Sequence, residues 1–281
     1  MPIIAGILYM TNFWSLVSLW TVPYTFNFHN TFAFAFFPLM VAFFIKGLKE
    51  TKWVRFICFS SMVSLLIAPA YINPTLALVQ VAFILFVTLL YLIQAKQNIL
   101  KLLARFPVFV GFYFLFNAYW ILPLIPLYQT FLSSPYRVYS PDVDAFRDHS
   151  VSLIDALRFS GSSGYWTLKT TVCNDQIIPW ASVYSSQFFV LLSFGLPLLA
   201  FLAIILKPRD KGVFLFSIIA VISVLFITGS NPPFGNLLEK ILYQSNLIAL
   251  FRDPFNKFGY FLSLSYSYLW AVSLSTLVKN E

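Results

Sequence analysis

The chain has 281 residues, of which 59% are hydrophobic and only 10% are charged. A soluble globular domain carries about 25% charged residues, so this composition excludes a water-soluble protein. The net charge of +8 does not indicate nucleic-acid binding, because no basic patch with interleaved aromatic residues stands clear of the apolar segments.

Apolar runs recur along the chain, and each is close to the roughly 20 residues that a helix needs to cross a bilayer. They cover about residues 3–20, 31–46, 55–71, 75–94, 106–129, 187–206, 213–229 and 256–278. Because lipid offers backbone groups no hydrogen-bond partner, runs of this length and uniform apolarity predict helices. We expect an all-α fold: a polytopic membrane helix bundle of about eight transmembrane helices, forming a single transmembrane domain over residues 1–281.

The connectors between these runs differ in charge. One alternating set of short connectors, together with the C-terminus, concentrates Lys and Arg and has a net charge of +8, whereas the other, longer set sums to 0. Short loops rich in Lys and Arg stay in the cytoplasm. The pattern therefore predicts an integral, multi-pass cell-membrane protein whose N-terminus and C-terminus are both cytoplasmic.

Two of the predicted external segments are long. Residues about 130–186 are polar and mixed, and we expect one long external loop there. Residues about 230–255 contain an amphipathic stretch, Phe234 to Leu250, that follows a Pro-Pro pair. Its apolar residues recur at helical spacing, which predicts a helix lying in the membrane interface; they are Leu237, Leu238, Ile241 and Leu242.

The segment Leu250–Phe258 enters the last predicted span from outside and places Arg252, Asp253 and Lys257 at the edge of the lipid. An Arg guanidinium offers a planar fork for phosphate oxygens, and a Lys ammonium adds a point charge. Pro254 is a favoured first residue of a helix, whose N-terminal amides attract anions. We expect Arg252 and Lys257 to bind the phosphate of a lipid-linked substrate. The alternative is a local Arg–Asp pair with snorkelling side chains.

Two further positions are candidate substrate contacts at the outer end of the fifth predicted span, Asn117 and Trp120. A polar side chain inside a helix bundle needs a hydrogen-bond partner. One interpretation makes the two residues a wall of an external substrate cleft. The other is an interhelical hydrogen bond beside an interfacial Trp.

Asp142 and Asp144, followed by His149, form an acidic cluster in the long external segment. Two carboxylates two residues apart in a loop could hold Mn²⁺ or Mg²⁺ against a sugar phosphate, since hard cations take oxygen ligands. Either carboxylate could also act as a general base on a sugar hydroxyl. The alternative is an ordinary solvated acidic loop.

Several segments resemble large polytopic glycosyltransferases of the GT-C superfamily, and most closely the arabinofuranosyltransferase-like membrane proteins. These segments are Asn117–Pro123, Thr228–Phe234 and Phe251–Phe258, together with Ile67–Pro74 as a short external turn. The resemblance implies an inverting transfer of a sugar from a polyprenyl-phosphate donor, on the outer face of the membrane, to a glycan or protein acceptor.

The sequence departs from that superfamily at one point. Its members usually carry a catalytic Asp or Glu in the first large external loop, but the first external connector here, about 21–30, holds no carboxylate. No catalytic residue is therefore carried over, and Asp142 and Asp144 are the fallback. We expect a fragment that lacks its leading spans, a degenerate relative, or an acid supplied from elsewhere; the uncharged start of the first span favours a fragment.

The leading hypothesis is a membrane glycosyltransferase, or the membrane core of one, with membrane lipid and a polyprenyl-phosphate sugar donor as partners. A lipid or solute transporter or flippase is the first alternative. Ion-coupled transport is disfavoured, because the predicted spans hold no ionisable residue away from their ends. The second alternative is a non-catalytic membrane assembly subunit, which the missing early carboxylate supports.

Overall fold

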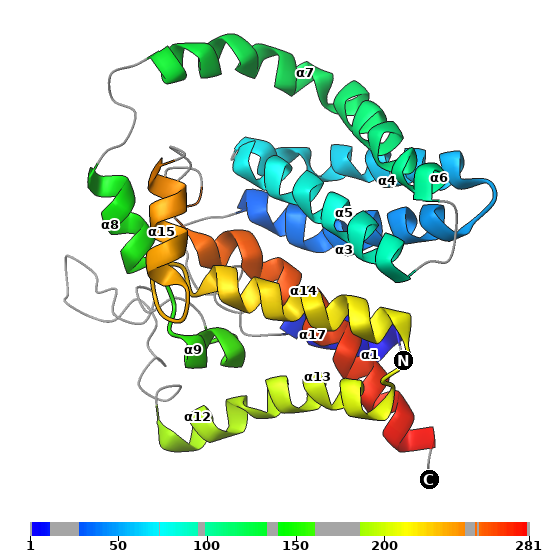
Figure 1. Cartoon of the computed structure of the whole chain (residues 1–281), viewed down its shortest axis with the longest axis vertical. Coiled ribbons are helices and arrows are strands. Elements are labelled where there is room, and N and C mark those ends of the chain that lie inside the picture. The colour runs from blue at the N-terminus through cyan, green and yellow to red at the C-terminus, as the bar shows by residue number, and fades with distance from the viewer. Residues whose placement is uncertain are drawn as a thin grey trace. The chain divides into compact units, whose positions relative to one another are not determined.

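Helices make up all the regular structure in the part of the chain that the computed structural model describes (Figure 1). The described residues are 2–11, 28–72, 74–94, 99–133, 140–160, 186–244, 251 and 253–279. The chain divides into two compact units, which we call the small unit, Asn27–Arg137, and the large unit, Met1–Phe26 with Val138–Glu281.

The small unit contains α3 (Phe28–Lys49), α4 (Trp53–Ile67), the short 3₁₀ helix η2 (Ala68–Ile72), α5 (Pro74–Gln94), α6 (Ile99–Leu103) and α7 (Arg105–Ser133). Buried serines of α4 hold its neighbours. Ser60 Oγ donates to the Met40 carbonyl of α3 at 2.7 Å, and Ser61 Oγ donates to the Phe109 carbonyl of α7 at 3.1 Å. Small side chains of this kind let membrane helices approach closely and bond across the interface.

The large unit contains α1 (Pro2–Thr11), α8 (Ser140–Asp148), α9 (Leu153–Arg158), α12 (Gln187–Ser193), α13 (Gly195–Leu206), α14 (Lys211–Ile227), α15 (Gly235–Gln244) and α17 (Pro254–Lys279). Helix α17 packs against α1, α13 and α14. Two of its side chains bond to the α13 backbone: Trp270 Nε1 donates to the Leu196 carbonyl at 2.7 Å, and Ser273 Oγ to the Leu199 carbonyl at 2.8 Å.

Helices α14 and α17 run antiparallel, as two ring pairs show. Phe216 stacks on Tyr268 with centroids 4.3 Å apart, and Phe226 stacks on Phe258 at 4.5 Å. Gly212, near the start of α14, leaves room for the Tyr268 hydroxyl, which a Cβ at that position would meet. The end of α14 therefore lies beside the start of α17, and this places the turn after α14 next to Pro254.

Within the described residues, six helical segments are long and apolar enough to cross a membrane, which indicates a multi-pass membrane protein. They are Thr31–Lys49, Trp53–Tyr71, Thr75–Gln94, Ile99–Pro126, Gln187–Leu206 and Pro254–Val278. The corresponding six predicted runs are confirmed as such helices.

The other two predicted runs are not confirmed as spans. Helix α14, for the run 213–229, has 17 residues and is apolar. Helix α1 (Pro2–Thr11) covers residues 3–11 of the run 3–20, and the remainder of that run from residue 12 lies outside the described residues. The count of eight spans stays a prediction, as does the orientation of the termini.

The long segment about 130–186 differs from the expected loop. Helix α7 continues to Ser133, and the segment contains the short helices α8 and α9. Helix α9 has a local cause, because the Ser152 hydroxyl accepts a hydrogen bond from the Asp155 amide and caps its first turn. Residues 161–185 lie outside the described residues.

Candidate functional site

Helices α8 and α15, which are far apart in sequence, pack through a small apolar cluster in the large unit. Phe146 of α8 and Leu242 of α15 are buried at its centre, with Val143, Leu238 and Phe251 packed against them. This cluster buries one face of α15. Polar residues beside it on both helices stay accessible to solvent.

Ser150, just after α8, fixes the turn that follows α14. Its hydroxyl donates to the Phe146 carbonyl at 2.6 Å and accepts from the Ser230 amide at 2.8 Å. Gly229 has φ +57°, a left-handed conformation that glycine adopts without steric cost, and a Cβ there would meet Ser150 and Pro254. The end of α8, the turn after α14 and the first residue of α17 therefore converge.

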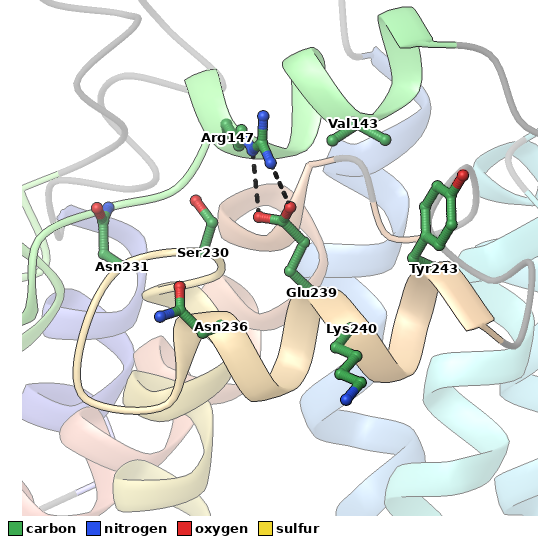
Figure 2. Close-up of a pocket in the computed structure, with 8 residues that line it drawn as sticks. All are labelled: Val143, Arg147, Ser230, Asn231, Asn236, Glu239, Lys240 and Tyr243. Carbon is green, nitrogen blue, oxygen red and sulfur yellow. Dashed lines mark hydrogen bonds and ion pairs between the residues drawn. The ribbon is translucent and has the colours of Figure 1, made fainter.

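Helix α8, the turn after α14 and helix α15 surround an open pocket of about 660 Å³ (Figure 2). Its lining residues are Val143 and Arg147 of α8, Ser230 and Asn231 of the turn, and Asn236, Glu239, Lys240 and Tyr243 of α15. The volume is within the roughly 300–1,000 Å³ range of small-molecule sites. Val143 is the one aliphatic side chain in this lining, and the other seven residues carry hydrogen-bonding groups beside apolar stems and the Tyr243 ring, so the pocket suits a ligand with both polar and apolar faces.

An ion pair joins the two helical walls of the pocket. The Arg147 guanidinium donates to both oxygens of the Glu239 carboxylate, from Nη2 to Oε1 at 2.6 Å and from Nε to Oε2 at 3.2 Å. Hydrogen bonding to Glu239 raises the pKa of Arg147 above its ordinary value. Arg147 is exposed, so solvent screens the pair, and its main effect is to set the geometry of α8 against α15.

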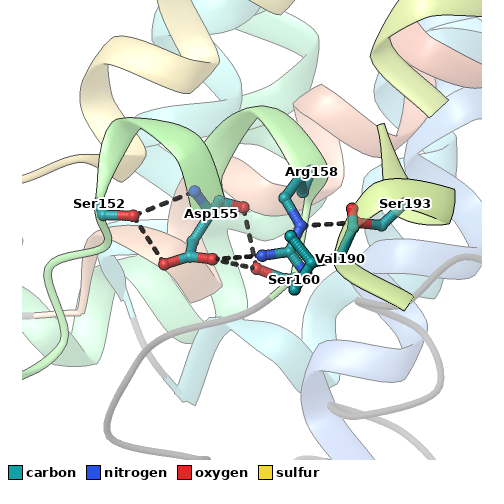
Figure 3. A network of polar contacts seen from close by, with 6 residues as sticks. All are labelled: Ser152, Asp155, Arg158, Ser160, Val190 and Ser193. Atoms are coloured by element: carbon teal, nitrogen blue, oxygen red, sulfur yellow. Dashed lines mark hydrogen bonds and ion pairs between the residues drawn. The ribbon is translucent and has the colours of Figure 1, made fainter. Parts of the chain in front are cut away.

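A second polar network lies around α9 (Figure 3). Arg158 is 7% exposed and donates to Asp155 Oδ1 at 3.0 Å and to Ser193 Oγ of α12 at 2.6 Å. Ser160 Oγ also bonds to Asp155 Oδ1, at 3.1 Å. These contacts use the charged groups to tie α9 to α12, and we assign this network a structural role.

The acidic cluster does not form the two-carboxylate loop on which the metal prediction depended. Positions 142 and 144 lie in α8, and residues two apart do not share a helix face. Asp144 is exposed, and no group of three or more His, Cys, Asp or Glu side chains assembles within the described residues. A Mn²⁺ or Mg²⁺ site at Asp142 and Asp144 stays a prediction.

The predicted phosphate clamp consists of Arg252 and Lys257, and the structure describes only Lys257. Lys257 is 4% exposed, in the first turns of α17, and does not line the pocket. Asp253 caps this helix by accepting from the Asn256 amide at 3.1 Å, and the Asn256 side chain also bonds to its carboxylate. Arg252 lies outside the described residues, so the clamp stays a prediction.

Asn117 and Trp120 belong to a buried network in the small unit. Asn117 is 0% exposed, and its Nδ2 donates to Ser64 Oγ at 2.5 Å and to the Tyr113 carbonyl at 2.8 Å. Its Oδ1 accepts from Trp120 Nε1 at 2.8 Å, and the Trp120 ring lies 4.8 Å from that of Tyr71. This geometry matches the interhelical hydrogen bond; a direct substrate contact stays a prediction.

The sequence interpretation missed the polar side of α15. Asn236, Glu239, Lys240 and Tyr243 are spaced i, i+3, i+4 and i+7, which places them on one helix face. The spacing is visible in the sequence, but the prediction of a helix there used only the apolar residues between them. The contribution of Arg147 from α8 had no local sequence pattern.

No known family model matches this chain, and comparisons with curated proteins and with solved structures find no match either. The fold and the site therefore define its class: a multi-pass helical membrane protein with an open pocket in its large unit.

Proposed function

We propose that the chain is a membrane glycosyltransferase, or the membrane core of one, that transfers a sugar from a polyprenyl-phosphate donor on the external face. The observation that supports this proposal most is that two segments predicted to be external both line the pocket. Arg147 comes from the first long segment that charge patterning assigns to the outside, and Glu239 comes from the second. One shared site on that side is what the proposed reaction requires.

The two sides of α15 favour a substrate that is anchored in lipid. Leu237 and Ile241, four residues apart, are 58% and 51% exposed, whereas Asn236 and Glu239 line the pocket. A helix with an exposed apolar stripe and a polar opposite side lies in the membrane interface. The pocket would then open at the depth of the lipid head groups, where a polyprenyl phosphate presents its sugar.

Within the described lining of the pocket, Glu239 is the one carboxylate and becomes our candidate general base in place of the exposed Asp144. A carboxylate accepts about four hydrogen bonds, and Arg147 occupies two. Glu239 would take the proton of an acceptor hydroxyl, whose oxygen bonds to the anomeric carbon while polyprenyl phosphate leaves with the electrons of the broken C–O bond. Arg252 keeps its proposed role as the phosphate contact.

One observation favours the assembly subunit as a second candidate. Both oxygens of Glu239 bond to Arg147, so the carboxylate already has a structural partner. In that interpretation the ion pair shapes a docking pocket and performs no proton transfer.

A transfer assay tests the proposal. The purified full chain would be placed in proteoliposomes with a radiolabelled polyprenyl-phosphate sugar and a mixed glycan and peptide acceptor pool. We expect transfer by the wild type and a loss of about 10²-fold or more in Glu239→Gln, the usual effect of removing a general base. The matched control Glu50→Gln alters an exposed carboxylate of the small unit and should keep full activity.

Three outcomes would redirect the proposal. Wild-type protein that binds polyprenyl phosphate without transferring sugar would favour the assembly subunit. Flux of the lipid or a solute across the liposome membrane would favour a transporter. Binding of polyprenyl phosphate that is equal in Arg252→Ala and in the control Arg209→Ala, an exposed connector position, would remove the phosphate clamp.

Thiol labelling of intact cells tests the shared external side. Single cysteines at positions 144 and 240, in a background without Cys58 and Cys173, should both react with an impermeant maleimide. Reaction of the two positions from opposite faces of the membrane would contradict a common external pocket.

A further inference from the structure

The pocket presents paired donors and acceptors. The amides of Asn231 and Asn236 and the hydroxyls of Ser230 and Tyr243 each both donate and accept. Among the eight residues drawn in Figure 2, the marked contacts join only Arg147 and Glu239, so the two amides bond to none of the other side chains shown. Such groups complement a ligand whose own hydroxyls both donate and accept.

The charges of the lining argue against a phosphate as the group held in the pocket. Phosphate sites rely on Arg forks and Lys ammonium groups that point at the anion. The Arg147 fork is bonded instead to Glu239, whose carboxylate would repel an anion. Lys240 is then the one cation of the described lining without a carboxylate bonded to it, and in Figure 2 it extends from α15 on the side away from Arg147.

The lining also lacks four surfaces by which proteins commonly hold peptides. These are an open strand edge, an apolar groove for a helix, an aromatic groove for a proline-rich segment, and an Arg cluster for a phosphopeptide. The described lining contains no strand, one aliphatic residue, Val143, one aromatic ring, Tyr243, and one Arg already paired. None of the four modes has its required surface here.

We propose that this pocket is the acceptor site and that the acceptor is an uncharged glycan rather than a polypeptide. The inference rests on the proposed function, since it names the acceptor of that reaction. The Asn231 and Asn236 amides bond to sugar hydroxyls, the exposed Tyr243 ring packs against the C–H groups of a sugar ring, and Glu239 faces the hydroxyl that is glycosylated.

Saturation-transfer NMR on the full chain in nanodiscs tests the assignment without requiring turnover. The probes are neutral oligosaccharides of mannose, glucose and arabinose, an uncharged Ser/Thr-containing peptide, and inorganic pyrophosphate. We expect saturation to pass from the protein to at least one oligosaccharide and not to the peptide. Asn236→Ala and Tyr243→Ala should each weaken binding about tenfold, the effect of losing one good contact.

Gln244→Ala is the matched control, because Gln244 is an exposed amide on the same helix outside the lining and its loss should leave binding unchanged. Saturation transfer to the peptide, displacement of the glycan by pyrophosphate, or equally weakened glycan binding in Gln244→Ala would overturn the assignment. If glycan binding depends on Asn236 but the wild type transfers no sugar, the glycan pocket is supported and the proposed enzymatic function is wrong. If Asn236→Ala and Tyr243→Ala transfer sugar as well as the wild type does, the enzymatic function is supported and the acceptor binds outside this pocket.

Discussion

The buried network around Asn117 gives the most quantitative prediction. Replacing Asn117 by Leu keeps the number and branching of the side-chain heavy atoms and removes hydrogen bonds to Ser64 and Trp120. Hydrogen bonds between membrane helices contribute about 0.6 kcal/mol on average and about 1.7 kcal/mol at most. The substitution also deprives the half-buried indole N–H of its acceptor. We therefore expect Asn117→Leu to lower the free energy of unfolding by about 1–3 kcal/mol.

A double-mutant cycle separates this bond from general packing. Asn117→Leu and Ser64→Ala, alone and combined, would be unfolded by titrating SDS into mixed micelles, with far-UV circular dichroism as the readout. The short 2.5 Å bond between α4 and α7 should give a coupling energy of about 0.6–1.7 kcal/mol. Thr88→Val is the control, since the Thr88 hydroxyl bonds within its own helix to the Ile84 carbonyl.

The same variants decide between the two interpretations of Asn117. Coupling with Ser64 but not with Thr88, and unchanged binding of polyprenyl phosphate, is expected for a structural bond. Zero coupling with Ser64 would refute our reasoning, and a loss of lipid binding at unchanged stability would restore Asn117 as a substrate contact.

Three other predictions concern the large unit. Gly212→Ala should cost about 1–3 kcal/mol through overpacking against Tyr268, and Tyr268→Phe should restore part of the loss in the same SDS titration; no rescue would contradict the contact. A spin label at Leu237 should be more accessible to oxygen than to a polar nickel reagent, with the reverse at Asn236, and equal accessibility would exclude an interfacial α15. Phe146→Ala should speed amide hydrogen exchange throughout α8, because its buried anchor is lost, and unchanged exchange would show that other contacts hold the helix.

The long helices could be predicted from the sequence because the membrane imposes a local requirement on each. A span must be apolar over its whole length and must satisfy its own backbone, so hydropathy alone located all six of the spans found among the described residues. One helix start and one shorter helix also had local causes. The last helix begins at Pro254, as expected for a residue without an amide hydrogen, and the spacing of Leu238 and Leu242 correctly predicted α15.

Helix α8 shows where local pattern stopped being sufficient. Its sequence is polar, and Val143 and Phe146 are too few to define an apolar face without knowledge of the partner. The acidic residues were therefore expected in a loop, where two carboxylates could share an ion. The contacts of Phe146 with α15 stabilise a helix instead, and the helix separates positions 142 and 144 onto different faces.

What the amino-acid order alone determined is the class of the protein, because the length and apolarity of each span are properties of one contiguous segment. What only the tertiary structure decided is the pocket. Arg147 and Glu239 are 92 positions apart, and a bond between them depends on how α8, the turn at Gly229 and α15 pack together. Side-chain contacts over that separation follow from packing and not from spacing, which is why the pocket could be found only in the folded chain.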